Sequence, residues 1–329
     1  MAQYTFIPFP DTGPMVHRAL RPAACHDRRQ PGTWFGALHL RATCLQPVHV
    51  GSGFKAEQNG GIVRRSARTG ARLGIPGSSF KGVIRSRFEA ITRSCAFEPP
   101  SERDKVLSQT YRDVEQGRLT DDVKKLPLFD GRCGERELLC PACALFGFEN
   151  SNGTLRSRIS FADLTTEDDV APETRDMPSQ FGPRIHHLGK FRIDDSRGLR
   201  EFVVGPLHGR KFYVDSAVRE PAVGHERVEA MASGTHLLGT IQLFNVETAE
   251  LGALLVALGV APASFLKVGA GKGHGFGRIR LDAMTYRLRD DRRRSKEPDV
   301  AGYSAAFEAS HDRWDAGVQK LLEIHGARN

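Results

Sequence analysis

The sequence predicts an α+β fold built on the split βαβ pattern. Segments in which apolar and polar residues alternate are typical of half-buried strands, and segments with apolar residues at helical spacing are typical of amphipathic helices. The predicted strands are 33–50, 155–164, 235–246 and 276–288, and the predicted helices are 78–94 and 248–259. Their order along the chain (strand, helix, insertion, strand, strand, helix, strand) is the order of a split βαβ fold.

These elements divide the chain into three regions. Residues 1–32 contain several prolines and scattered charge, and are expected to form an arm or irregular extension. Residues 33–290 hold the core, which is interrupted by a charged insertion at 96–145 and a long extension at 166–212. Residues 291–329 are expected to be a charged linker and a C-terminal helix. Five apolar residues share one face of this last helix: Phe307, Trp314, Val318, Leu321 and Leu322.

The start of the first predicted helix is suited to holding phosphate. Ser78 or Ser79 can cap it by accepting hydrogen bonds from its first free amides. Lys81 and Arg85 follow on one side, and residues 63–95 contain eight Lys or Arg against a single acid. Free N–H groups, a positive dipole end and cations favour an anion here. An ordinary capped helix with a solvated basic face would show the same pattern.

A second candidate for phosphate binding is the glycine-rich segment 265–279. Its glycines alternate with Lys272 and His274, and Lys267 and Arg278 flank them. Glycine lets a backbone approach a ligand closely and adopt positive φ, as a phosphate-cradling loop requires. The loop lacks the ending of a nucleotide P-loop, which argues against a mononucleotide site. Tight hairpins use the same residue types.

Three motifs together resemble one known family. They are the helix start IPGSSFKG at 75–82, the pattern CxxCxLFG at 140–147 and the loop GxGxxxGFGR at 269–278. The chain thereby resembles the RAMP superfamily of CRISPR proteins over about residues 36–281. It is most similar to the repeated backbone subunit of type III and type VII-like class 1 effector complexes.

The resemblance implies a modified ferredoxin-like (RRM-related) fold and several copies stacked along a guide RNA that pairs with complementary target RNA. The partners would be guide RNA, target RNA, further copies of the chain and other effector subunits. A β-hairpin thumb would interrupt the guide–target duplex at intervals. The residues expected to contact RNA outside the thumb are His49, Lys55, Ser78, Ser79, Lys81, Arg85, Lys267, Lys272, His274 and Arg278.

The extension 166–212 is the expected thumb, because a segment of this length is hard to place inside a compact domain. It contains two basic, strand-like runs. Met177, Phe181 and Pro183 would wedge between bases, and flanking cations would hold the RNA backbone: Arg184, His186 and His187. A loop that docks a protein partner is the alternative.

Four cysteines predict a metal site. Cys133, Cys140 and Cys143 lie within eleven residues, and a CxxC turn brings two thiolates onto one ion. Cys95, at the end of the first helix, is the best candidate for a fourth ligand. Zinc with four sulfur ligands has no open position and would be structural. Redox-active or unliganded cysteines are the alternative.

Catalysis is in doubt from the sequence. In the type III backbone subunits that the chain resembles, an aspartate in the loop after the first strand cuts target RNA. Here the loop from His49 to Gly61 contains Glu57 as its only acid. The chain is therefore interpreted as a guide-RNA binder that is inactive as a nuclease, with weak Glu57-dependent cleavage left open.

Two other functions remain open. A guide-RNA-processing or target-RNA endonuclease of the same superfamily would use histidines for acid–base chemistry, and the candidates are His49, His186, His187 and His274. A generic single-stranded RNA-binding module would stack bases on exposed aromatics, and the candidates are Phe54, Phe181 and Phe191.

Composition agrees with a polyanionic partner. The 329 residues carry a formal net charge of +8, and the sequence pI is about 9.3. A basic surface without a nucleic-acid partner would give the same values. No apolar run is long enough to span a membrane, and the N-terminal residues lack the pattern of a signal peptide. A cytoplasmic protein with reduced cysteines is expected.

Overall fold

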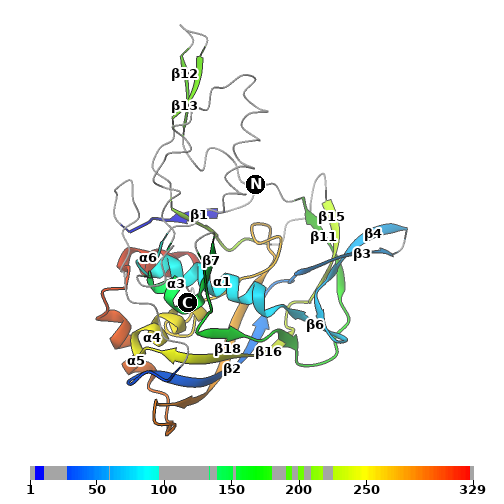
Figure 1. Ribbon diagram of the computed structural model, residues 1–329. Coiled ribbons are helices and arrows are strands. Elements are labelled where there is room, and N and C mark those ends of the chain that lie inside the picture. The colour runs from blue at the N-terminus through cyan, green and yellow to red at the C-terminus, as the bar shows by residue number, and fades with distance from the viewer. Residues whose placement is uncertain are drawn as a thin grey trace.

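The computed structural model describes residues 4–10, 28–58, 60–95, 133, 139–150, 153–179, 190–194, 199–203, 209–217 and 225–326. Its helices are α1 (Gly77–Ile91), α3 (Pro141–Phe146), α4 (Thr248–Leu258), α5 (Val300–Glu308) and α6 (Asp315–His325). The long strands of the core are β2 (Trp34–Cys44), β16 (His236–Val246) and β18 (Arg278–Arg289). The predicted α+β class is confirmed (Figure 1).

The other strands are short. They are β1 (Tyr4–Ile7), β3 (Gly51–Gln58), β4 (Gly61–Ser66), β5 (Arg68–Thr69), β6 (Arg72–Ile75), β7 (Phe148–Asn150), β8 (Gly153–Leu155), β9 (Ile159–Phe161), β10 (Leu164–Thr166), β11 (Glu173–Pro178), β12 (Lys190–Asp194), β13 (Leu199–Val203), β14 (Arg210–Tyr213), β15 (His225–Ala230), β17 (Leu266–Lys267) and β19 (Ser295–Lys296).

The main sheet is centred on β2. Its strand order is β17-β18-β2-β16-β10-β6-β5, with β9 also paired to β16 and β19 to β18. β2 is antiparallel to both neighbours, and Leu40 pairs with Gly239 of β16 and Met284 of β18. The three long strands correspond to the predicted strands 33–50, 235–246 and 276–288, because all three carry clear apolar alternation.

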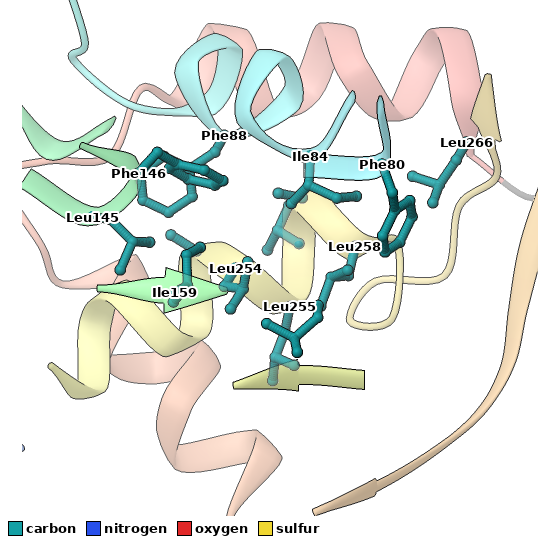
Figure 2. Close-up of a cluster of buried hydrophobic side chains, with 14 of the residues drawn as sticks. Phe80, Ile84, Phe88, Leu145, Phe146, Ile159, Leu254, Leu255, Leu258 and Leu266 are labelled. Atoms are coloured by element: carbon teal, nitrogen blue, oxygen red, sulfur yellow. The ribbon is translucent and has the colours of Figure 1, made fainter. Parts of the chain in front are cut away.

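Helices α1 and α4 pack together through their apolar faces. Phe80, Ile84 and Phe88 of α1 are buried at successive turns, and they lie beside Leu254 and Leu258 of α4 (Figure 2). The helical spacing that predicted this face is therefore confirmed. Burial of each such side chain contributes roughly 1.5–3 kcal/mol. This packing fixes the direction of α1 and leaves one side of its first turns facing outward.

The region 51–74, which lies between the predicted strand 33–50 and the predicted helix 78–94 and was expected to contain no regular element, forms strands. β3 and β4 make a hairpin, and β5 and β6 follow it before α1. The hairpin belongs to a second sheet of order β11-β15-β4-β3. Both faces of β3 are largely exposed, so its sequence shows none of the apolar alternation by which strands are recognised.

The predicted strand 155–164 is broken into pieces. β8 ends at Leu155, β9 occupies Ile159–Phe161, and β10 begins at Leu164. Ser157 interrupts the run because its hydroxyl donates to the backbone oxygen of Ile159 at 2.6 Å. Arg158, next to it, points into the core.

The two ends of the chain are also more ordered than expected. β1, in the arm predicted to be irregular, pairs with β14 through Tyr4–Tyr213 and Ile7–Arg210. The expected single C-terminal helix is two helices, α5 and α6, with Trp314 as the N-cap of α6. Phe307 therefore lies on a different helix from Val318.

The extension 166–212 contains the expected hairpin. β12 and β13 pair antiparallel from Lys190–Val203 to Asp194–Leu199. β11 and β14, at the two ends of the extension, belong to other sheets. Among the described residues, no helix has the length and apolar character required to cross a membrane.

Candidate functional site

The start of α1 is held by a residue far away in the sequence. Pro76 is the N-cap, and neither Ser78 nor Ser79 caps the helix. The amide of Gly77 instead donates to Oδ1 of Asp163 at 2.7 Å. The predicted serine cap is therefore wrong. A Cβ on Gly77 would lie 2.2 Å from the backbone oxygen of Phe161, so glycine is required for this close approach.

The two serines are exposed and line different hollows on the two flanks of α1. The first, called here the Ser78 hollow, has a volume of about 540 Å³ and is lined by Ser78, Lys81, Arg156, Ser160, Phe161 and Gln242, among others. None of the described residues that line it carries a carboxylate. Burial, and secondly the charge of Arg85, lower the pKa of Lys81. An anion bound in this hollow would favour the charged form of Lys81 and so oppose both effects.

The second hollow, called here the Ser79 hollow, has a volume of about 360 Å³. It lies between α1, β14 and the glycine-rich loop, and its polar lining includes Ser79, Ser86, Lys211, Tyr213, Lys267 and Lys272. Its described lining residues also lack carboxylates. The structure thus brings Ser79 together with two of the loop lysines predicted from the sequence, Lys267 and Lys272.

The glycine-rich loop is fixed against the turn that follows β2. Gly269 has φ +71°, and a Cβ there would lie 2.1 Å from the backbone oxygen of His49. The amide of Ala270 donates to that same oxygen at 2.9 Å. The positive φ and the close approach both require glycine, and they direct Lys272 into the Ser79 hollow. His274 is half-buried in the same loop.

Both arginines that were predicted to contact RNA outside the thumb are engaged inside the protein. Arg85 donates to Glu89 at 2.8 Å and to the backbone oxygen of Gly147 at 2.8 Å. Burial opposes the charge of Arg85, but the Glu89 carboxylate outweighs it and raises the pKa of Arg85. Arg278 donates to Asp215 at 2.6 Å.

His49 is 2% exposed, and burial lowers its pKa. Its Nδ1 lies 2.7 Å from the backbone oxygen of Glu229. The imidazole is therefore a structural group. Both the predicted RNA contact and the candidate acid–base role of His49 would require an accessible side chain, and His49 does not offer one.

Met177 is also buried. It is 0% exposed and packs with Val228 and Phe276, so in this conformation it cannot insert between bases as predicted. Lys55, on β3, is exposed and lies on the hairpin, in a different sheet from α1. Other predicted thumb residues lie outside the described part of the chain: Phe181, Pro183, Arg184, His186 and His187.

The structure adds residues that sequence reasoning missed. Arg156 and Gln242 line the Ser78 hollow, and Lys211 and Tyr213 line the Ser79 hollow. Lys211 and Tyr213 occupy alternate positions of β14, so the only available signal was a basic, aromatic strand. Nothing in the sequence relates that strand to α1.

The four predicted metal ligands do come together. The sulfur atoms of Cys95, Cys133, Cys140 and Cys143 all lie within 4.8 Å of one another, and all four residues are buried. Sγ of Cys95 lies 3.5 Å from that of Cys140 and 3.7 Å from that of Cys143. Four sulfurs at 2.3 Å from one tetrahedral ion would be about 3.8 Å apart. The cluster is therefore compatible with a closed zinc site.

The cluster favours a thiolate at Cys140, whereas hydrogen bonds with Cys133 and Cys140 raise the pKa of Cys95 and of Cys143. Hydrogen bonds from Cys133 and then Cys143 lower the pKa of Cys140 well below its ordinary value. The amide of Cys140 donates to Sγ of Cys133 at 3.1 Å, and Nη2 of Arg85 lies 3.6 Å from Sγ of Cys143. Donors of this kind stabilise the negative charge of metal-bound sulfur. The position of Arg85 is thus explained by the cluster.

Comparison with known proteins gives one family. The family model of the RAMP superfamily matches residues 41–280, which is well over half of the chain. This range includes α1, the glycine-rich loop and the four clustered cysteines. A solved structure described as "Type IV-B CRISPR Complex" is similar, with 16% identity, a TM-score of 0.36, and coverage of 80% of this chain and 96% of that chain. None of the curated proteins matches.

Proposed function

The chain belongs to the RAMP superfamily of CRISPR proteins, and from this premise we propose that it is a guide-RNA-binding backbone subunit of an RNA-guided effector complex. Several copies would stack along one guide and position complementary target RNA beside other effector subunits. The cytoplasm would be the compartment in which this assembly forms.

One observation carries the proposal. The first turns of α1 are flanked on both sides by hollows whose described lining residues include lysines and serines but no carboxylate. Three acids lie near α1 or the glycine-rich loop. Asp163 accepts from a backbone amide, Glu89 pairs with Arg85, and Asp215 pairs with Arg278 and Lys267. A surface that excludes carboxylates while retaining cations suits a polyanion.

The topology supports a modified ferredoxin-like (RRM-related) core. Taken in chain order, β2, α1, β9, β16, α4 and β18 follow the β–α–β–β–α–β sequence of that fold. In space the strands are arranged β18-β2-β16-β9. Within this core the β12–β13 hairpin would be the thumb, since among the described residues it pairs with no other sheet.

The cysteine cluster would hold a structural zinc ion. Cys95 follows α1 and Cys140 is the N-cap of α3, so the metal would staple the insertion to the helix that carries both hollows. Four sulfur ligands leave no open position, and the ion would supply stability and no chemistry.

An endonuclease of the same superfamily is less well supported. His49, one candidate for acid–base chemistry, is buried. Glu57, the acid of the region after β2, is exposed on β3. We therefore place target cleavage, if the assembled complex performs it, in a separate subunit.

Replacement of Lys81 by alanine tests the phosphate contact directly. We expect Lys81→Ala to weaken binding of single-stranded RNA about fivefold, equal to about 1 kcal/mol, and equally for unrelated sequences because phosphates carry no sequence information. The dependence of log affinity on log salt should become shallower by about 0.7, the value for one phosphate contact on a single strand.

Lys296→Ala is the matched control, since Lys296 is equally a lysine but is exposed on β19 at the far end of β18. Affinity and salt dependence that change no more in Lys81→Ala than in Lys296→Ala would contradict an RNA contact at Lys81. Fluorescence anisotropy over a salt series measures both quantities.

A further inference from the structure

The N-terminal ribbon, which consists of β1 and β14, is attached to the core through side chains. The two strands pair with each other and with no other strand among the described residues. A two-stranded ribbon is at best marginally stable by itself in water. Its apolar side chains Ile7 and Phe212 are buried, and polar contacts hold it at both ends. At one end, the backbone oxygen of Tyr213 accepts a hydrogen bond from Nε2 of His325 at 2.9 Å.

Arg210 holds the other end of the ribbon. Its Nη2 donates to the backbone oxygen of Cys95 at 2.8 Å, and its Nη1 donates to Glu89 at 2.8 Å. The guanidinium carbon also lies 5.4 Å from the ring centroid of Phe9, just beyond β1. The Arg210 side chain is only 12% exposed, so water and salt screen these contacts little. Arg210 thus joins the ribbon to the segment that carries Cys95.

The backbone oxygen that Arg210 contacts belongs to a residue of the cysteine cluster. Cys95 lies outside the helices and strands, so no regular element fixes the direction of its carbonyl. Its Sγ is one of the four clustered sulfurs and lies 3.5 Å from that of Cys140. An ion bound by the cluster would fix Cys95 through its sulfur, and with it the carbonyl that holds Arg210.

A second connection between the cluster and Arg210 runs through Glu89. One carboxylate oxygen of Glu89 pairs with Arg85 and the other with Arg210, each at 2.8 Å. Nη2 of Arg85 in turn lies 3.6 Å from Sγ of Cys143. Four thiolates on one divalent ion carry excess negative charge, which the Arg85 cation offsets. The backbone of Cys95 and the carboxylate of Glu89 therefore both link the cluster to the ribbon.

We propose that Arg210 is a positioning residue that couples metal occupancy of the cysteine cluster to the order of the N-terminal ribbon. When the cluster is loaded, Cys95 and Glu89 hold Arg210, and β14 stays on the core. When the metal is lost, the ribbon loosens. Because β14 contributes Lys211 and Tyr213 to the wall of the Ser79 hollow, this hollow keeps its shape only while the metal is bound. The coupling rests on the proposed zinc site.

Hydrogen exchange of the full chain, measured by mass spectrometry with zinc bound and after a chelator, tests the coupling. Zinc removal should speed the exchange of amides 4–7 and 210–213 about tenfold, within the usual range of coupling between two sites. The β3–β4 hairpin, which belongs to another sheet, should exchange as before, and β2 reports global unfolding. Ribbon amides that exchange equally fast with and without zinc would overturn the proposal.

The variant Arg210→Met decides the matter even if the chelator unfolds the whole chain. It cuts both connections and keeps all four cysteines. With zinc bound, its ribbon should exchange fast. Because coupling is reciprocal, its zinc affinity, measured by competition with a chelator, should fall about tenfold. The matched control is Arg64→Met, which removes an arginine that pairs with Glu226 in the second sheet and should change neither quantity.

The outcomes separate the coupling from an ordinary structural role and from the zinc site itself. Fast ribbon exchange in Arg210→Met with the zinc affinity of Arg64→Met would show a purely structural contact and overturn the coupling. One zinc per chain with a ribbon that does not respond to it would reject the coupling alone. A chain that binds no zinc would reject the zinc site and the coupling together.

Discussion

Replacing Cys140 by serine is expected to lower the free energy of unfolding by about 4 kcal/mol or more. Sγ of Cys140 lies 3.5 Å from Sγ of Cys95. Cys140 is also the N-cap of α3, the helix that carries Cys143. Where a metal site forms only in the folded state, the free energy of metal binding contributes directly to the stability of the fold. Loss of one ligand also leaves three buried thiolates without their counter-ion, which is unfavourable in the interior.

Cys44 provides the matched control. It is a buried cysteine of β2 outside the cluster, and burial raises the pKa of its thiol to about 12. Cys44→Ala should cost only the packing of a small side chain and should keep one zinc per chain. A chelator should lower the unfolding midpoint of the unmodified chain and of Cys44→Ala but leave Cys140→Ser unchanged. Absence of metal in protein purified without chelators, together with no response to the chelator, would refute the zinc site.

The second large effect is expected at Glu250. Glu250 and Arg158 are both 2% exposed at their side chains and form a two-pronged ion pair, one arm of which measures 2.8 Å. Arg158 also donates to the backbone oxygen of Ala144 in α3 at 2.8 Å. Removal of one partner leaves a buried charge uncompensated, so Glu250→Ala should cost about 3–5 kcal/mol in urea unfolding.

A double-mutant cycle separates this explanation from loss of packing. The double variant Arg158→Met, Glu250→Leu removes both charges. Its loss of stability should be smaller, by more than about 1 kcal/mol, than the summed losses of the single variants Arg158→Met and Glu250→Leu. Additive effects would show that the two side chains act independently and would contradict the account of the pair.

Some features of the site were readable from local sequence. The apolar spacing of Phe80, Ile84 and Phe88 repeats within one helix, and the CxxC turn places two cysteines by itself. The glycines of the 265–279 loop were recognised for the same reason, since their backbone needs are local.

Other features depend on contacts between distant segments. Arg85 and Lys81 look alike in the sequence, but only Arg85 reaches Glu89 and the cysteine cluster. Asp163 accepts a hydrogen bond from the first amide of α1, 86 positions away in the sequence, and no local sequence pattern indicates this contact. Lys211 of β14 lines the Ser79 hollow beside α1, although the two elements are far apart in the sequence. The exposed β3 lacks the burial pattern that reveals strands.

The RNA that accompanies the chain from cells tests the central claim most directly. The chain would be purified from cells that also express a repeat–spacer array, and its bound RNA would be sequenced against the total RNA pool. The account predicts strong enrichment of discrete repeat-derived RNAs, and a clear reduction of that enrichment in a Lys81→Ala, Lys272→Ala double variant of unchanged folding stability. Protein free of RNA, or RNA that mirrors the total pool, would contradict it.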